Sequence, residues 1–247
     1  MPPPLPIGPS TAAKISQLIV INLIYTVIIA VLALYVFFKT KLAYTLTKHK
    51  GILYFRLSFL FLAIMFIIRL ATRLLFEINR TTSLHIPLHK WTFLGLALSG
   101  ILSLICLLYS LLWHIFEPTE DKDHAPLVLI GIALILSFLA IQGRAFNTLV
   151  GIIIVSFIAC FIIKWVSTTK KKWFWKTGTI YLSFFVFWML NLYTVMLANQ
   201  RVLLRAPIFI GSTLLFLFIA YKVHCHFPNL SKKIAKNPKN NCQNQCV

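Results

Sequence analysis

The sequence predicts an all-α membrane protein, a polytopic bundle of seven transmembrane helices. Of its 247 residues, 59% are hydrophobic and only 12% are charged, whereas a soluble domain carries about 25% charged residues. The apolar residues are gathered into seven runs, and helices are the economical way for such runs to satisfy their backbone hydrogen bonds in lipid. We therefore expect a short Pro-rich segment over 1–14, the seven-helix bundle over 15–222, and a basic, disordered cytoplasmic tail over 223–247.

Each apolar run is long enough to span a bilayer as a helix. In chain order the runs cover residues 15–38, 52–76, 91–115, 126–142, 148–166, 179–198 and 203–222. The first run is too long for the core of a cleaved signal peptide. The fourth and fifth runs are the shortest, and the tight connection 143–147 separates them.

Basic residues in the connections predict the orientation. Lysines gather after the first run, after the fifth run and in the tail: Lys39, Lys41, Lys48, Lys50, Lys170, Lys171, Lys172, Lys176, Lys232, Lys233, Lys236 and Lys239. On the opposite side basic residues are fewer: Lys14, Arg80, Lys90, Arg144, Arg201 and Arg205. Because positive charge is retained on the cytoplasmic side, we expect the N-terminus outside, the C-terminus in the cytoplasm, and residence in the cell (plasma) membrane.

The net charge of +19 indicates contact with lipid. No basic segment is long enough to form a nucleic-acid-binding module, so nucleic acid is not an expected partner. The charge lies between apolar runs, where it orients the protein and meets anionic headgroups at the cytoplasmic face. Trp173, Phe174 and Trp175 stand among lysines in the fifth connection, a composition typical of an interfacial anchor.

The second apolar run carries charge inside a membrane segment, which is costly and often functional. Arg56 lies near one of its ends, and Arg69, Arg73 and Glu77 lie near the other. Arg69 and Arg73 are one turn apart and share a helical face. Near the outer side Glu77 is the only carboxylate.

Guanidinium groups suit the recognition of phosphate or carboxylate. The arginines therefore predict an outward-facing site for an anion or a lipid headgroup, built from five residues: Arg69, Arg73, Arg144, Arg201 and Arg205. In the alternative interpretation each arginine snorkels to the interface or pairs with Glu77 and nearby carbonyl groups.

Neither catalysis nor a cofactor is expected. No Asp, Glu or His lies at mid-membrane depth, so a carboxylate pair or bis-histidine haem ligation cannot form there. The acidic connection 117–124 lacks the spacing of a calcium loop. The tail residues Cys225, Cys242 and Cys246 lack the close cysteine spacing of a zinc site. We expect no catalytic residues, no metal and no cofactor.

Seven helices with an outward N-terminus resemble the plan of G-protein-coupled receptors in helix count and orientation. Receptor motifs are missing, since the third run ends Leu-Trp-His114 without an acidic–Arg–aromatic triplet. The stretch His49-Lys-Gly-Ile-Leu-Tyr-Phe-Arg-Leu-Ser-Phe59, with Arg69 following, resembles uncharacterised seven-helix integral membrane proteins of archaea. That resemblance covers one helix and implies no activity.

These observations favour a non-enzymatic, sensor- or receptor-like membrane protein. It would bind an anionic ligand or lipid from outside and pass a helix shift to a membrane or cytoplasmic protein partner at the inner face. Two alternatives remain open. One is a small transporter or channel subunit, and the other is an accessory subunit of a membrane complex.

Overall fold

The computed structural model describes the backbone of residues 9–82, 89–116, 125–141, 151–152, 154–159, 162–163, 178–196 and 205–236. Side chains are described over 20–75, 91–111, 128, 130–139, 151–152, 154–159, 162–163, 178–194 and 206–225. All the regular structure in these residues is helical, as the sequence predicts.

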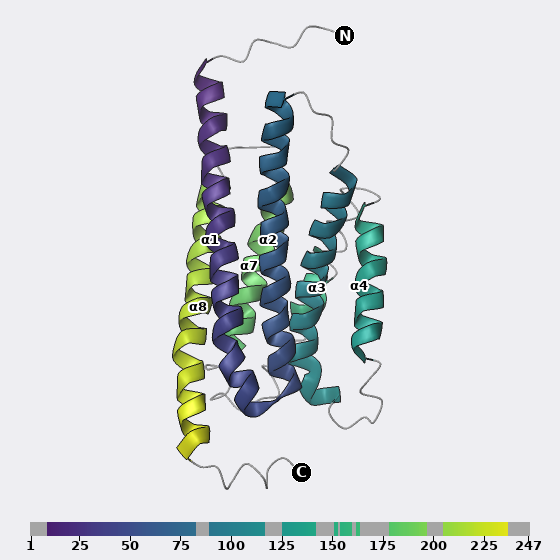
Figure 1. Cartoon of the computed structure of the whole chain (residues 1–247), viewed down its shortest axis with the longest axis vertical. Helices are drawn as coiled ribbons and strands as arrows, with labels where there is room; N and C mark the ends of the chain where they lie inside the picture. Colours follow the sequence, from purple (N-terminus) through teal and green to yellow (C-terminus); the bar gives the residue numbers. More distant parts are fainter. Residues whose placement is uncertain are drawn as a thin grey trace.

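The longer helices stand roughly parallel to one another (Figure 1). They are α1 (Pro9–Thr47), α2 (Lys50–Thr82), α3 (His89–Phe116), α4 (Ala125–Ile141), α7 (Thr179–Met196) and α8 (Arg205–Lys236). Helix α1 packs against α2 and α8, α3 packs between α2 and α4, and α7 packs on α8. Of the predicted fifth helix, the structure describes short helical stretches within 151–163.

Among the described residues, four helices are long and apolar enough to cross a membrane: Val20–Thr47, Lys50–Leu75, Trp91–Leu111 and Ala206–Cys225. The apolar stretches Ile130–Leu139 and Thr179–Thr194 are shorter. Large apolar side chains also cover the outside of the bundle, for example Phe38, Phe138 and Leu214, each more than 60% exposed. A soluble monomer rarely exposes such surface. The protein is therefore embedded in a membrane.

Helices α1 and α2 form a hairpin whose turn is Lys48 and His49. Lys48 has a positive φ of 50°, and its N–H donates to the Tyr44 carbonyl at 2.7 Å. This is the left-handed cap that commonly ends a helix. We call this end of the bundle the hairpin end and the opposite end, where α2 terminates, the far end (Figure 1).

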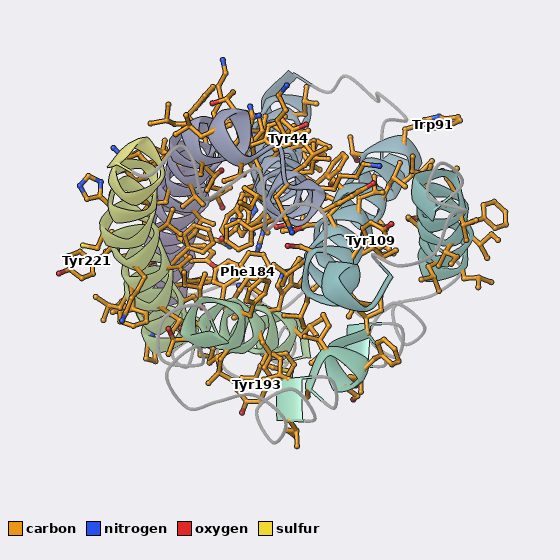
Figure 2. All side chains as sticks on the ribbon, turned by 90° about the horizontal axis from the view of Figure 1, so that it is seen from below. Tyr44, Trp91, Tyr109, Phe184, Tyr193 and Tyr221 are labelled. Carbon is orange, nitrogen blue, oxygen red and sulfur yellow. The ribbon has the colours of Figure 1, made fainter. Side chains whose placement is uncertain are left out.

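Aromatic rings fill the middle of the bundle. Phe59 of α2 contacts Phe184 of α7 at 5.1 Å between ring centroids and Phe216 of α8 at 6.0 Å. Phe187 lies 4.9 Å from Phe216, and these four rings are almost completely buried. Figure 2 shows Phe184 inside the ring of helices, whereas Tyr193 and Tyr221 point outward. Because lipid is as apolar as these side chains, close packing rather than exclusion of water holds the helices together.

Three helices extend well beyond the apolar runs that predict them, and one of them, α2, continues past residue 76 to Thr82. Helix α1 continues past residue 38 to Thr47, and α8 continues past residue 222 to Lys236. The first part of the expected tail, residues 223–236, is therefore helical rather than disordered. Hydrophobicity marks the part of a helix that lies in lipid, and backbone hydrogen bonding can carry the helix further into the polar region.

Candidate functional site

Arg69 turns into the bundle. Its side chain is partly buried on α2, and the guanidinium carbon lies 5.9 Å from the ring centroid of Phe66, one turn nearer the hairpin end. The guanidinium also interacts electrostatically with the Tyr25 hydroxyl of α1. Helical side chains lean toward the N-terminus of their helix, which for α2 is the hairpin end. Arg69 therefore leans toward the middle of the membrane, against the direction that snorkelling to the far end requires.

Tyr25 is held from three sides. It is 2% exposed, its ring stacks on Phe209 of α8 at 4.7 Å, and it meets Phe66 of α2 edge-on at 5.9 Å. Its hydroxyl donates to Oδ1 of Asn191 in α7 at 2.9 Å. The Asn191 amide nitrogen in turn donates to the Phe187 carbonyl at 2.9 Å, which leaves the amide oxygen directed at Tyr25.

Several buried polar atoms nearby make no well-formed hydrogen bond. Among the described residues these atoms are Asn22 Oδ1 and Trp188 Nε1, and Ser212 Oγ lies near the Tyr25 hydroxyl without full hydrogen-bond geometry. Each belongs to a residue one turn from a member of the Tyr25 contact set: Asn22 from Tyr25 itself, Trp188 from Asn191, and Ser212 from Phe209. A buried polar group without a partner costs free energy, and more so where no water is at hand. Such groups gathered at one level are uncommon enough to need an explanation.

We call Asn22, Tyr25, Arg69, Asn191 and Ser212 the polar centre. Its residues come from α1, α2, α7 and α8, so it forms only where these four helices meet. The chain has five carboxylates, Glu77 and four within 117–123, and none is among the side chains that the structure describes. The positive charge of Arg69 interacts with the Tyr25 hydroxyl, and an anion would complement that charge.

The predicted arginine site is described in part. Arg69 and Arg73 lie one turn apart on α2, and both are partly buried. Arg205 is the first residue of α8, but its side chain, like Arg144 and Arg201, lies outside the described residues. The convergence of all five arginines therefore stays a prediction.

The other members of the polar centre are hard to identify as site residues from the sequence. Asn191 and Ser212 are polar residues inside apolar runs, which helix packing alone can explain. Tyr25 resembles any aromatic residue of a membrane helix. Their grouping depends on which helix faces meet, and the sequence of each helix does not specify that.

No family model, curated protein or solved structure matches the chain. The site is therefore interpreted from its geometry and chemistry alone.

Proposed function

We propose that this is a non-enzymatic, sensor-like, multi-pass protein of the cell membrane that binds an anionic group at the polar centre. The ligand would present a carboxylate or phosphate, either on a small molecule or on a lipid. The observation that carries the proposal is the direction of Arg69, whose guanidinium lies near the Phe66 ring and interacts electrostatically with Tyr25. In this proposal seven helices cross the membrane, and the far end faces outward.

The polar centre has suitable chemistry for an anion. A guanidinium fork binds a carboxylate or phosphate through two parallel hydrogen bonds. The Ser212 hydroxyl, which lies near the Tyr25 hydroxyl, can donate a third. Hydrogen bonds to charged groups contribute about 1.5–3 kcal/mol each, so loss of one bond of the fork should weaken binding by roughly tenfold to a hundredfold, and loss of both bonds by more.

Binding suits the described interior better than conduction does. On the hairpin side of the polar centre, Phe59, Phe184 and Phe216 close the middle of the bundle with contacting rings. A pathway for ions or polar solutes would need hydroxyl, amide or charged groups there. This packing favours a sensor over a small transporter or channel subunit.

A signal could pass along the helices themselves. Helix α2 runs from the polar centre to the hairpin, and α8 runs from it toward Lys236 at the same end (Figure 1). A ligand bound between Arg69 and Ser212 would favour one position of α2 relative to α8. Such a shift requires the ligand to bind one arrangement more tightly than the other, and it would be presented to a partner at the hairpin end.

The test uses the full chain in nanodiscs of zwitterionic lipid, with decanoate and dodecyl phosphate as probes in calorimetric titrations. We expect at least one probe to bind, with at least tenfold weaker binding in Arg69→Gln and partial recovery in Arg69→Lys. Lys222→Gln is the matched control, because it removes one charge from α8 and should leave the affinity unchanged. Thermal melts establish that the variants fold. Absence of binding to the wild type, or equal affinity in Arg69→Gln, would refute the proposal.

A further inference from the structure

A second arginine of α2 lies in a different environment near the hairpin end. The Arg56 guanidinium carbon stands 4.1 Å from the ring centroid of Phe37 in α1. Its Nε is buried and makes no hydrogen bond. Stacking covers a face of the planar group, whereas the N–H groups point outward in its plane. Because Nε is buried, an additional group can meet only the terminal Nη groups of the guanidinium.

The depth of Arg56 matches the edge of the hydrocarbon layer. It is six residues beyond Lys50, the first residue of α2, which corresponds to about 9 Å along the helix axis. Its side chain leans back toward the helix N-terminus, so the guanidinium lies nearer to the headgroups than its Cα does. Charged side chains at this depth reach phosphate groups without entering the bilayer centre.

The surroundings of Arg56 combine positive charge with apolar surface. Lys41 is exposed and lies one turn beyond Phe37 on the same face of α1. The adjoining side chains of Phe38 and Leu42 are exposed and apolar, so an acyl chain can pack against them. Lys48 and Lys50 add charge at the turn.

We propose that Arg56, Lys41 and Phe37 form a binding site for the phosphate of one anionic phospholipid in the leaflet at the hairpin end. The Arg56 fork binds the phosphate oxygens, and the Phe37 ring fixes the plane of the fork. Lys41 contributes charge from the headgroup side, while the acyl chains lie along Phe38 and Leu42. The site is independent of the polar centre, which lies in the other half of the membrane.

A point charge would attract any anionic lipid loosely, whereas a stacked fork selects a phosphate in one geometry. Lys222 provides the comparison within the same protein. Its ammonium lies 5.6 Å from the Phe218 ring of α8, and its helix neighbour His224 contacts Tyr35 of α1, so Lys222 and Phe37 differ in depth by about one helical turn. Lys222 thus places the same charge near an aromatic ring, but its ammonium lacks the two parallel N–H groups of a guanidinium.

The experiment is native mass spectrometry of the full chain released from nanodiscs of phosphatidylcholine and phosphatidylglycerol. We expect one retained phosphatidylglycerol in the wild type and at least tenfold lower occupancy in Arg56→Gln. Arg56→Lys and Phe37→Leu should retain intermediate amounts, because each keeps the charge but loses the fork or its support. Lys222→Gln should match the wild type.

Two results would overturn the proposal. One is unchanged phosphatidylglycerol occupancy in Arg56→Gln and Phe37→Leu. The other is an equal loss in Lys222→Gln, which would mean general attraction to the surface. Addition of excess inorganic phosphate distinguishes a lipid site from a site for free phosphate. If the lipid is not displaced, the site is a lipid site, and displacement contradicts the proposal. If Arg56→Gln does not fold, the phosphatidylglycerol occupancy of Phe37→Leu is compared with that of Lys222→Gln, and this comparison decides the question.

Discussion

The Tyr25 hydroxyl donates to Oδ1 of Asn191 at 2.9 Å and thereby joins α1 to α7 across 166 residues of chain. Phe209 stacks on the same tyrosine ring, so the contact also fixes α8. Polar side chains inside membrane bundles are most useful where they make such cross-helix bonds. The same hydroxyl interacts electrostatically with Arg69, so stability and the candidate site depend on the same pair, Tyr25 and Asn191.

A double-mutant cycle measures this bond. Tyr25→Phe and Asn191→Ala should each destabilise the protein, and the pair should be coupled by about 0.5–1.5 kcal/mol. Reversible unfolding in mixed micelles provides the free energies. Tyr193→Phe, on the exposed face of α7, is the control and should have no effect. Strictly additive losses would show that the hydrogen bond contributes nothing.

Gly100 marks the closest packing of α3 against its neighbours. A Cβ placed there would lie 3.1 Å from the Met65 sulfur and 3.3 Å from a ring carbon of Trp188. Gly100→Val should therefore destabilise the bundle by about 1–3 kcal/mol, the usual cost of overpacking. Gly131 of α4 has no atom within 4 Å of such a Cβ, so Gly131→Val is the matched control. Equal melting temperatures of the two variants would mean that α2, α3 and α7 do not meet as described.

The packing of α1 on α8 can be tested by cross-linking. The Tyr35 hydroxyl lies 2.6 Å from Nδ1 of His224, and the two rings are stacked. In a chain whose five native cysteines are replaced by serine, Tyr35→Cys with His224→Cys should cross-link efficiently through a short bismaleimide. Val31→Cys with His224→Cys, one turn removed on α1, should react much less. A gel shift reports the yield, and comparable yields would argue against this helix contact.

Sidedness follows from the hairpin. Lys48 is at the turn, whereas Trp91 near the start of α3 is 73% exposed at the far end. In the same cysteine-free chain, Lys48→Cys and Trp91→Cys should therefore react with an impermeant maleimide from opposite sides of the membrane. The lysine distribution further predicts that position 48 is cytoplasmic. Labelling of both positions from one side would mean that α2 does not cross the bilayer.

The sequence predicts the helices well because each depends on a local run of apolar residues. Residues 52–76, for example, mark the membrane part of α2. The ends of α1 and α8 exceed their apolar runs, since a helix continues wherever its backbone remains bonded. The last turns of α8 are as polar as a loop would be, and composition does not separate the two.

The candidate site is predictable only in its charge. Arg69 is conspicuous in the sequence because charge is rare inside a membrane helix. Arg69 turns toward Tyr25 because of the way α1 and α2 are rotated about their axes. The packing of rings such as Phe66 and Phe209 against Tyr25 determines that rotation.

The distribution of the polar centre over α1, α2, α7 and α8 has a consequence for biosynthesis. While the chain is being made, Arg69 enters the membrane long before Asn191 and Ser212 have been translated. During that interval its charge must be accommodated by water, headgroups or the insertion machinery. Insertion of the last two helices would then complete the centre, so assembly of the bundle and acquisition of the site are the same event.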